Sequence, residues 1–147
     1  MIRKNLYIKG LILTAAMLLL ASCSQQPEKI HYGSDECEFC KMMITDNRFA
    51  AQLVTDKGKV YKFDAIECLA DYINEQPGKA EGAKFWVSNF ANPGEWVGVD
   101  QAHFVKSEEI QSPMGESLLA FCTVEQRRNH LSEFNGKPIT WEEIKTL

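Results

Sequence analysis

The sequence lacks a basic patch, and this absence excludes one large class of partner. Its 147 residues contain 16 Lys and Arg against 20 Asp and Glu, a net charge of −4. Proteins that bind nucleic acid need clustered cations to contact the phosphates, so we expect no nucleic-acid partner. Also missing is any Ser/His/Asp set or carboxylate pair with an evident acid–base role. The sequence therefore does not predict an enzyme.

A long hydrophobic run is missing as well. The apolar stretch from Leu11 to Ala21 is about half of the ~20 residues that a membrane-spanning helix needs. It follows a basic start without acidic residues, in which the charges are Arg3, Lys4 and Lys9. A basic start followed by a short apolar run is typical of a signal peptide. We predict that residues 1–22 are a signal peptide and are removed.

The end of this signal resembles the lipobox of bacterial lipoproteins. Leu20-Ala21-Ser22 is followed by Cys23, the residue that would be acylated and become the new N-terminus. We therefore expect the protein to be lipid-anchored to a bacterial membrane and to face the periplasm. Ser24, in place of Asp, resembles the pattern of lipoproteins that are sorted to the outer membrane.

The remaining chain is long enough for one domain with a hydrophobic core. It keeps 13 basic and 20 acidic residues, a net charge of −7. Residues 24–36 are polar and include a Pro and a Gly, a composition typical of a linker. We predict a flexible tether over residues 23–36 and a folded domain over residues 37–147.

Hydrophobic patterning within this domain predicts a mixed α+β fold. Apolar or alternating runs typical of strands occupy residues 49–54, 60–63, 85–87, 96–99, 103–105 and 117–121. Asp64 with Glu67, and Thr123 with Gln126, have the spacing of helix-capping boxes, and a last short helix is expected over 141–147. The order is strand, strand, helix, strand, repeated once. We predict two small ββαβ units packed as one domain.

Four cysteines remain once Cys23 carries lipid, and in an oxidising compartment they would by default form two disulfides. Cys37 and Cys40 form a C-x-x-C pair. A thiol–disulfide oxidoreductase is one alternative, although its pair sits where a strand meets a helix, whereas this one follows a polar segment. Half of a zinc site is another, but zinc wants four ligands, and no second C-x-x-C or H-x-x-x-H exists.

Methionine placement favours a different metal. Of five Met in the sequence, only three follow the signal: Met42 and Met43 directly after the C-x-x-C pair, and Met114 in a Pro-Met-Gly turn. Thiolate and thioether ligands select Cu(I). We predict a Cu(I) site made by Cys37, Cys40, Met42 and Met114. Secondary candidates are Met43, Cys68 and His31, whereas Cys122, at a strand end, is expected to be buried.

Three motifs resemble those of the NosL-type copper lipoproteins. They are Cys37-x-x-Cys40-x-Met42-x-Ile44, Phe63-Asp64-Ala65-Ile66-Glu67-Cys68 and Ser112-Pro113-Met114-Gly115. The resemblance implies a membrane-attached Cu(I) chaperone that supplies nitrous oxide reductase during denitrification, or a related cuproenzyme, with a membrane copper transporter as a further partner. It also implies a pair of ββαβ units, a fold shared with the organomercurial lyases.

In that family a Cys of the C-x-x-C pair and a remote Met hold Cu(I). Carried onto this chain, these positions are Cys37 or Cys40, and Met114. Two residues depart from the family pattern: Lys41 stands where Gly is common, and Glu38 where His is often found. The resemblance therefore leaves the third ligand open, with His31 or Met42 as possible replacements for the missing imidazole.

Overall fold

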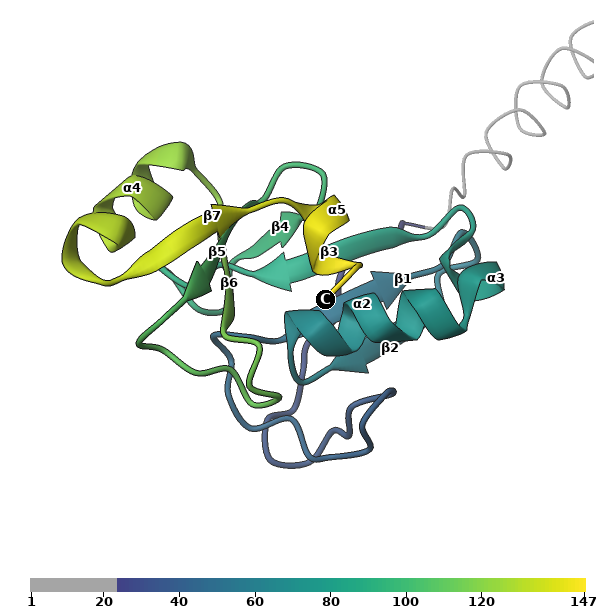
Figure 1. The fold of residues 1–147 in the computed structure, drawn as a ribbon. Helices are drawn as coiled ribbons and strands as arrows, with labels where there is room; N and C mark the ends of the chain where they lie inside the picture. Colours follow the sequence, from purple (N-terminus) through teal and green to yellow (C-terminus); the bar gives the residue numbers. More distant parts are fainter. Residues whose placement is uncertain (1–23) are drawn as a thin grey trace, which may run out of the picture.

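Two antiparallel sheets side by side form the computed structural model (Figure 1), which describes residues 24–147. The predicted signal peptide and Cys23 lie outside the described residues. The first sheet has the order β2-β1-β3-β4, with β1 (Ala51–Val54), β2 (Val60–Phe63), β3 (Lys84–Ser88) and β4 (Trp96–Gly98). The second has the order β6-β5-β7, with β5 (His103–Ser107), β6 (Leu118–Phe121) and β7 (Gly136–Ile139). This mixed α+β architecture with two antiparallel sheets confirms the predicted class.

The long helix of each half of the chain falls between the second and third strands of its sheet. The helices are α2 (Ile66–Glu75), α3 (Pro77–Ala80), α4 (Val124–Glu133) and α5 (Trp141–Ile144). Each sheet thus contains the order strand, strand, helix, strand, and β4, α3 and α5 are additions to it. The sequence signal for β7 is weak because the strand contains Gly136 and Pro138. A Cβ at Gly136 would lie 2.9 Å from Cγ1 of Val105, so the close pairing with β5 requires glycine there.

One of the two predicted helix caps is present and the other is not. Before α4, the Thr123 hydroxyl accepts a hydrogen bond from the N–H of Gln126, and the Gln126 side chain accepts one from the N–H of Thr123. The prediction for Asp64 is wrong. Helix α2 begins at Ile66 after an extended Ala65 that has no side-chain cap. Asp64 is buried instead, and its Oδ1 atom has no hydrogen-bond partner.

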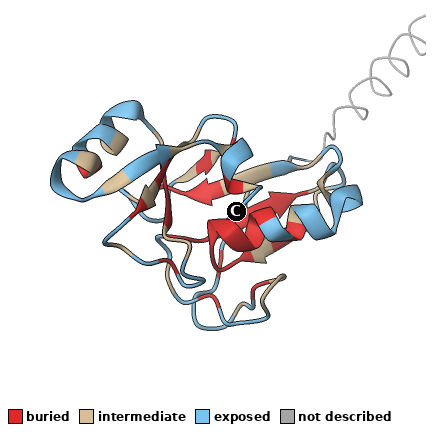
Figure 2. Ribbon diagram, in the orientation of Figure 1, coloured by how far each residue is buried: buried red, intermediate tan, exposed pale blue. Residues whose placement is uncertain are grey.

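The main core lies between α2 and the first sheet, where buried residues concentrate (Figure 2). Ile66 and Leu69 of α2 are fully buried against this sheet. The rings of Phe63 and Tyr72 contact each other with centroids 5.2 Å apart. All four residues of β1 are buried, because this strand is central and covered on both faces. Helix α2 covers one face, and the chain before β1 covers the other.

That second cover is the segment for which the sequence predicted a flexible tether. Gln52, fully buried on β1, donates to the carbonyl of Glu28 (2.7 Å) and accepts from its N–H (2.8 Å). The Trp86 indole N–H donates to the carbonyl of Gln25 (3.1 Å), and Ile30 is buried in the core. The segment is thus fixed on the sheet from Gln25 onward. The side-chain amide of Gln52 holds its main chain, an interaction that the polar composition of the segment does not reveal. Within residues 24–147, no helix has the length and hydropathy needed to cross a bilayer.

Candidate metal centre

Three cysteines come together beside the start of α2. The sulfur atoms of Cys37, Cys40 and Cys68 all lie within 4.8 Å of one another. Cys37 and Cys68 are fully buried, whereas Cys40 is partly exposed. The C-x-x-C pair was expected to form the site, with Cys68 only as a secondary candidate. On the helix, Cys68 faces away from the stripe of Ile66 and Leu69, and the fold places the C-x-x-C turn against it.

A tight hairpin fixes the positions of Cys37 and Cys40. The N–H of Cys37 donates to the carbonyl of Met42 (2.8 Å), and the N–H of Lys41 donates to the carbonyl of Cys37 (3.1 Å). Lys41 adopts the left-handed conformation, with a φ of 62°, which is unusual for a residue other than glycine. The N–H of Glu38 donates to the carbonyl of Lys62 on β2 (2.8 Å). Because β2 leads directly into α2, this contact sets the C-x-x-C turn beside Cys68.

Hydrogen bonding makes the three thiols electrostatically unequal. The pKa of Cys37 is lowered from 9.0 to about 5, chiefly because the Cys68 thiol donates to it; backbone N–H groups, including that of Asp64, add to the effect, and burial opposes it. The same hydrogen bond and burial raise the pKa of Cys68. Burial raises the pKa of Cys40. At neutral pH the cluster therefore holds one thiolate and two thiols, ready to exchange protons for a metal ion.

The loop that carries Met114 is attached to the residue before Cys68. The Ser112 hydroxyl donates to Oε1 of Glu67, and the N–H of Glu116 donates to the same oxygen (3.3 Å). Glu67 is buried in the first turn of α2, and its pKa is raised mainly by that burial. Met114 itself is 40% exposed. The thioether is thus carried on a loop anchored next to the thiol cluster.

The other predicted ligands lie at the surface. Met42 and Met43 are both exposed. His31 is exposed as well, and its Nδ1 atom lies 3.7 Å from the carboxylate of Asp35. Cys122 is not in the cluster and is partly exposed, although burial still raises its pKa. All four cysteines that the structure describes are free thiols, so the default expectation of two disulfides is not met in this part of the chain.

Three sulfur atoms at this spacing can share one soft metal ion. Low-coordinate sulfur sites suit Cu(I), while a structural zinc site takes four N or S ligands. Among the described residues, this is the one place where three or more Cys, His, Asp or Glu side chains converge in this way. The fold and the site thus define a class: small α+β proteins with a buried sulfur cluster suited to a soft metal.

The chain belongs to the NosL family, which it matches over residues 29–146. A curated relative, the copper-binding lipoprotein NosL of Stutzerimonas stutzeri, is 24% identical over 128 residues, which are 82% of this chain and 67% of the relative. The fold is similar to the crystal structure of the copper chaperone NosL from Shewanella denitrificans. That likeness has a TM-score of 0.67 at 20% identity and covers 82% of this chain and 96% of the other.

Proposed function

We propose that the protein is a Cu(I) chaperone that binds one ion between the three-cysteine cluster and Met114. The observation that carries the proposal is the convergence of Cys37, Cys40 and Cys68 within 4.8 Å. Membership of the NosL family and the copper-binding lipoprotein of that family support the choice of metal. The family is one of copper chaperones rather than enzymes, and transfer of an ion requires no covalent chemistry.

The burial of the ligands suggests an order of transfer. Cys37 and Cys68 are fully buried, while Cys40 and Met114 are partly exposed. An acceptor can therefore replace the exposed sulfur donors first, while the buried pair still holds the ion. As the ion leaves, the Cys68 thiol regains its proton and again donates to the Cys37 thiolate. Each acceptor ligand replaces one donor ligand, so Cu(I) never becomes free.

We further propose that lipid on Cys23 anchors the chaperone to a membrane, facing the periplasm, and that outer-membrane sorting follows from Ser24. The lipobox-like sequence and the named lipoprotein relative support the anchor. Nitrous oxide reductase is the proposed acceptor, on the strength of the family motifs. A membrane copper transporter is the proposed donor. The acidic charge of the chain, −7 after the signal, favours association with cationic surfaces of such partners.

A thiol–disulfide oxidoreductase is the rival function, and the lowered pKa of Cys37 is the observation in its favour. An attacking thiolate must, however, reach its substrate. Cys37 has no exposed surface, so a substrate disulfide has no access to it. Because Cys37 is buried, its lowered pKa favours metal binding over attack on a substrate disulfide.

Anaerobic competition for Cu(I) against a chromogenic chelator tests the proposal. Cys68→Ala and Met114→Ala should each weaken the apparent Cu(I) affinity about tenfold or more, equivalent to about 1.4 kcal/mol. Cys122→Ala is the matched control and should bind like the wild type. Equal affinity of Cys68→Ala and wild type would overturn the site. Catalysed reduction of insulin by the metal-free protein would instead support the rival.

A further inference from the structure

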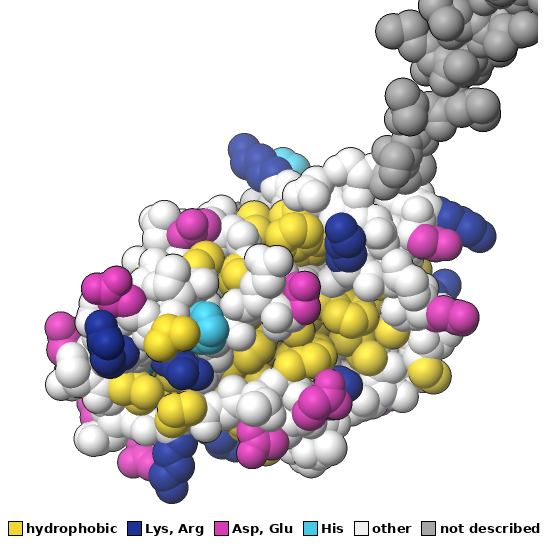
Figure 3. Space-filling model, turned by 90° about the horizontal axis from the view of Figure 1, so that it is seen from above, with side chains coloured by type: hydrophobic (Ala, Val, Ile, Leu, Met, Phe, Trp, Pro, Cys, Tyr) yellow, Lys and Arg dark blue, Asp and Glu magenta, His cyan; other side chains and the backbone are white. Residues whose placement is uncertain are grey.

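A large groove with aromatic side chains in its lining lies between the two sheets, away from the cysteine cluster. Its volume is about 890 Å³, within the range of ~300–1,000 Å³ typical of ligand sites. Aromatic rings line it from both sides: Trp141 of α5 lies 6.4 Å from Phe85 of β3 and 6.0 Å from Phe104 of β5, between ring centroids. Figure 3 shows hydrophobic side chains gathered in the middle of the upper face of the molecule. The groove is unrelated to the proposed copper site.

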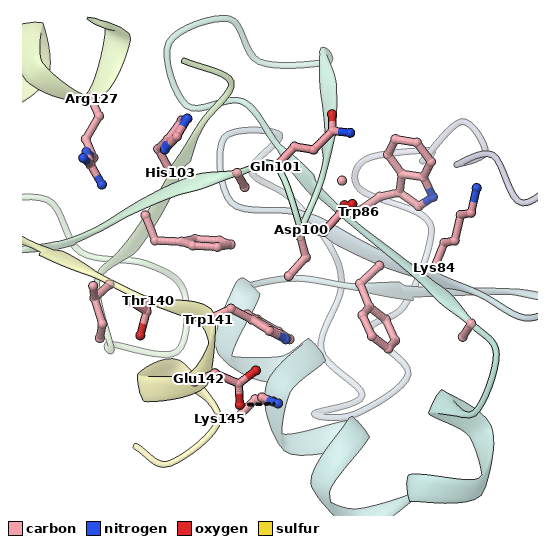
Figure 4. Close-up of a pocket in the computed structure, with 17 residues that line it drawn as sticks. Lys84, Trp86, Asp100, Gln101, His103, Arg127, Thr140, Trp141, Glu142 and Lys145 are labelled. Carbon is pink, nitrogen blue, oxygen red and sulfur yellow. Dashed lines mark ion pairs between the residues drawn. The ribbon is translucent and has the colours of Figure 1, made fainter. Parts of the chain in front are cut away.

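The edge of this groove is polar. Lys84 and Trp86 lie toward one end of it and Arg127 toward the other, with Trp141 between them (Figure 4). Lys145 forms an ion pair with Glu142 (2.8 Å) beside the Trp141 ring. An apolar floor with a polar edge fits an elongated apolar chain that ends in a polar head.

The groove and the N-terminus meet at Trp86. This residue lines the groove, and its indole N–H donates to the carbonyl of Gln25 (3.1 Å). The Gln25 side chain in turn donates to the carbonyl of Gly82 (2.7 Å), which fixes the chain just before β3. Cys23 precedes Gln25 by two residues, a span of at most about 7 Å. Lipid attached to Cys23 would therefore start within about 7 Å of Gln25, the residue bonded to Trp86 of the groove.

We propose that an acyl chain of the lipid carried by Cys23 lies in this groove. The proposal rests on the lipidation of Cys23 in the proposed function, and it adds a binding site for that lipid. The attachment point favours this occupant, because Cys23 lies two residues before Gln25, whose carbonyl accepts from the Trp86 indole N–H. The polar ester or amide head lies at the groove edge near Lys84, and the hydrocarbon chain lies on Phe85, Phe104 and Trp141.

Photo-cross-linking of the lipidated protein tests this site. Cells are fed a fatty acid with a diazirine near its end, so that the acyl chains of lipoproteins become photoreactive, and their membranes are irradiated. The expected product joins the acylated Cys23 peptide to tryptic peptide 85–106, which contains Phe85 and Phe104, or to peptide 129–145, which contains Trp141. Intramolecular products identify the chain on Cys23, whereas phospholipid adducts identify lipid from the bilayer.

Two variants control the experiment. Ala102→Phe narrows the groove, which Ala102 lines, and should abolish the intramolecular cross-link. Ala80→Phe places the same ring on α3, outside the lining, and should retain it. Phospholipid adducts alone, cross-links only to other peptides, or an unchanged yield in Ala102→Phe would each overturn the proposal. If Ala102→Phe fails to fold, the cross-linked peptides of the wild-type protein still test the proposal. The mass of the N-terminal peptide tests acylation separately, and the Cu(I) titration tests the chaperone function independently of both.

Discussion

Ser112 and Glu67 lie 45 residues apart and share a buried hydrogen bond, in which the Ser112 hydroxyl donates to the Glu67 carboxylate. Ser112 also accepts from the N–H of Ser117 (2.9 Å). Glu67 immediately precedes Cys68, and Ser112 belongs to the Met114 loop. Together with the bond from the N–H of Glu116 to the same carboxylate, this contact links the thiol and thioether parts of the proposed copper site.

The first prediction concerns this link. Ser112→Ala leaves the buried Glu67 oxygen without its hydroxyl donor, and we expect a loss of about 1–3 kcal/mol in the free energy of unfolding, measured in urea. Cu(I) affinity should fall as well, because the Met114 loop is no longer held. Adding Met114→Ala should then cost less than it does in the wild type, since coupled residues are not additive. Ser117→Ala is the control, because it removes a half-buried hydroxyl of the same loop that bonds to Gly115 and not to Glu67. Full additivity would show that the contact does not position Met114.

The second prediction concerns the thiolate. Because the Cys68 thiol is the main cause of the low pKa of Cys37, Cys68→Ala should raise that pKa from about 5 toward 9.0. In the metal-free variant, the ultraviolet absorbance of the thiolate should therefore be lost at a pH well above 5. In the wild type, the absorbance should persist until the pH falls to about 5. Cys122→Ala should titrate like the wild type. An unchanged titration in Cys68→Ala would mean that backbone N–H groups stabilise the thiolate alone.

The third prediction concerns Lys41 in the C-x-x-C turn. A residue with a Cβ in the left-handed conformation costs roughly 1–2 kcal/mol, and glycine avoids this cost at the expense of a more flexible unfolded chain. We expect Lys41→Gly to stabilise the protein by about 1 kcal/mol, seen as a higher urea midpoint with an unchanged m-value. Lys57→Gly is the matched control: Lys57 has no positive φ, so this substitution should destabilise. Equal effects of the two would contradict the explanation.

The fourth prediction concerns the docked N-terminal segment. Gln52→Leu removes both hydrogen bonds to the main chain of Glu28 and should release the segment from β1. Unpaired buried backbone groups cost about 1–3 kcal/mol, and trypsin should cleave faster after Lys29. Gln101→Leu, at an exposed position, should leave cleavage unchanged. The same slow cleavage in Gln52→Leu would show that Ile30 alone holds the segment.

Local patterns predicted the elements of the fold well. Strand β2 has the predicted bounds, and the capping box at Thr123 is present, because alternation and capping depend only on neighbouring residues. The prediction of a cap at Asp64 was wrong because burial of this residue outweighs its local spacing. Asp64 lies in the interior, and the helix starts two residues later. The tether failed for a similar reason, since the partner of Glu28 is Gln52, more than twenty residues away.

The candidate site was predictable only in part. Cys37 and Cys40 are only three positions apart, so their motif is visible in the sequence. Cys68 joins the cluster because the C-x-x-C turn packs against β2, where the N–H of Glu38 donates to the carbonyl of Lys62. The spacing of residues in the sequence does not predict this contact. Cys68 faces away from the core stripe of Ile66 and Leu69, so its burial comes from the C-x-x-C turn and not from the pattern of its own helix. Whether Met42 and Met114 bind copper stays a prediction.

The fixed position of Gln25 has a consequence for how copper is delivered. Gln25 is bonded near Gly82, just after α3, whereas Cys68 lies in the first turn of α2. The seven residues of α2 that follow Cys68 span on the order of 10 Å of the distance between these points. If Cys23 carries the proposed lipid, the proposed copper ligands stand at a nearly constant height above the bilayer, instead of sweeping a wide volume. Encounters with an acceptor then become a two-dimensional search, and an acceptor held at the same height is favoured over one diffusing freely.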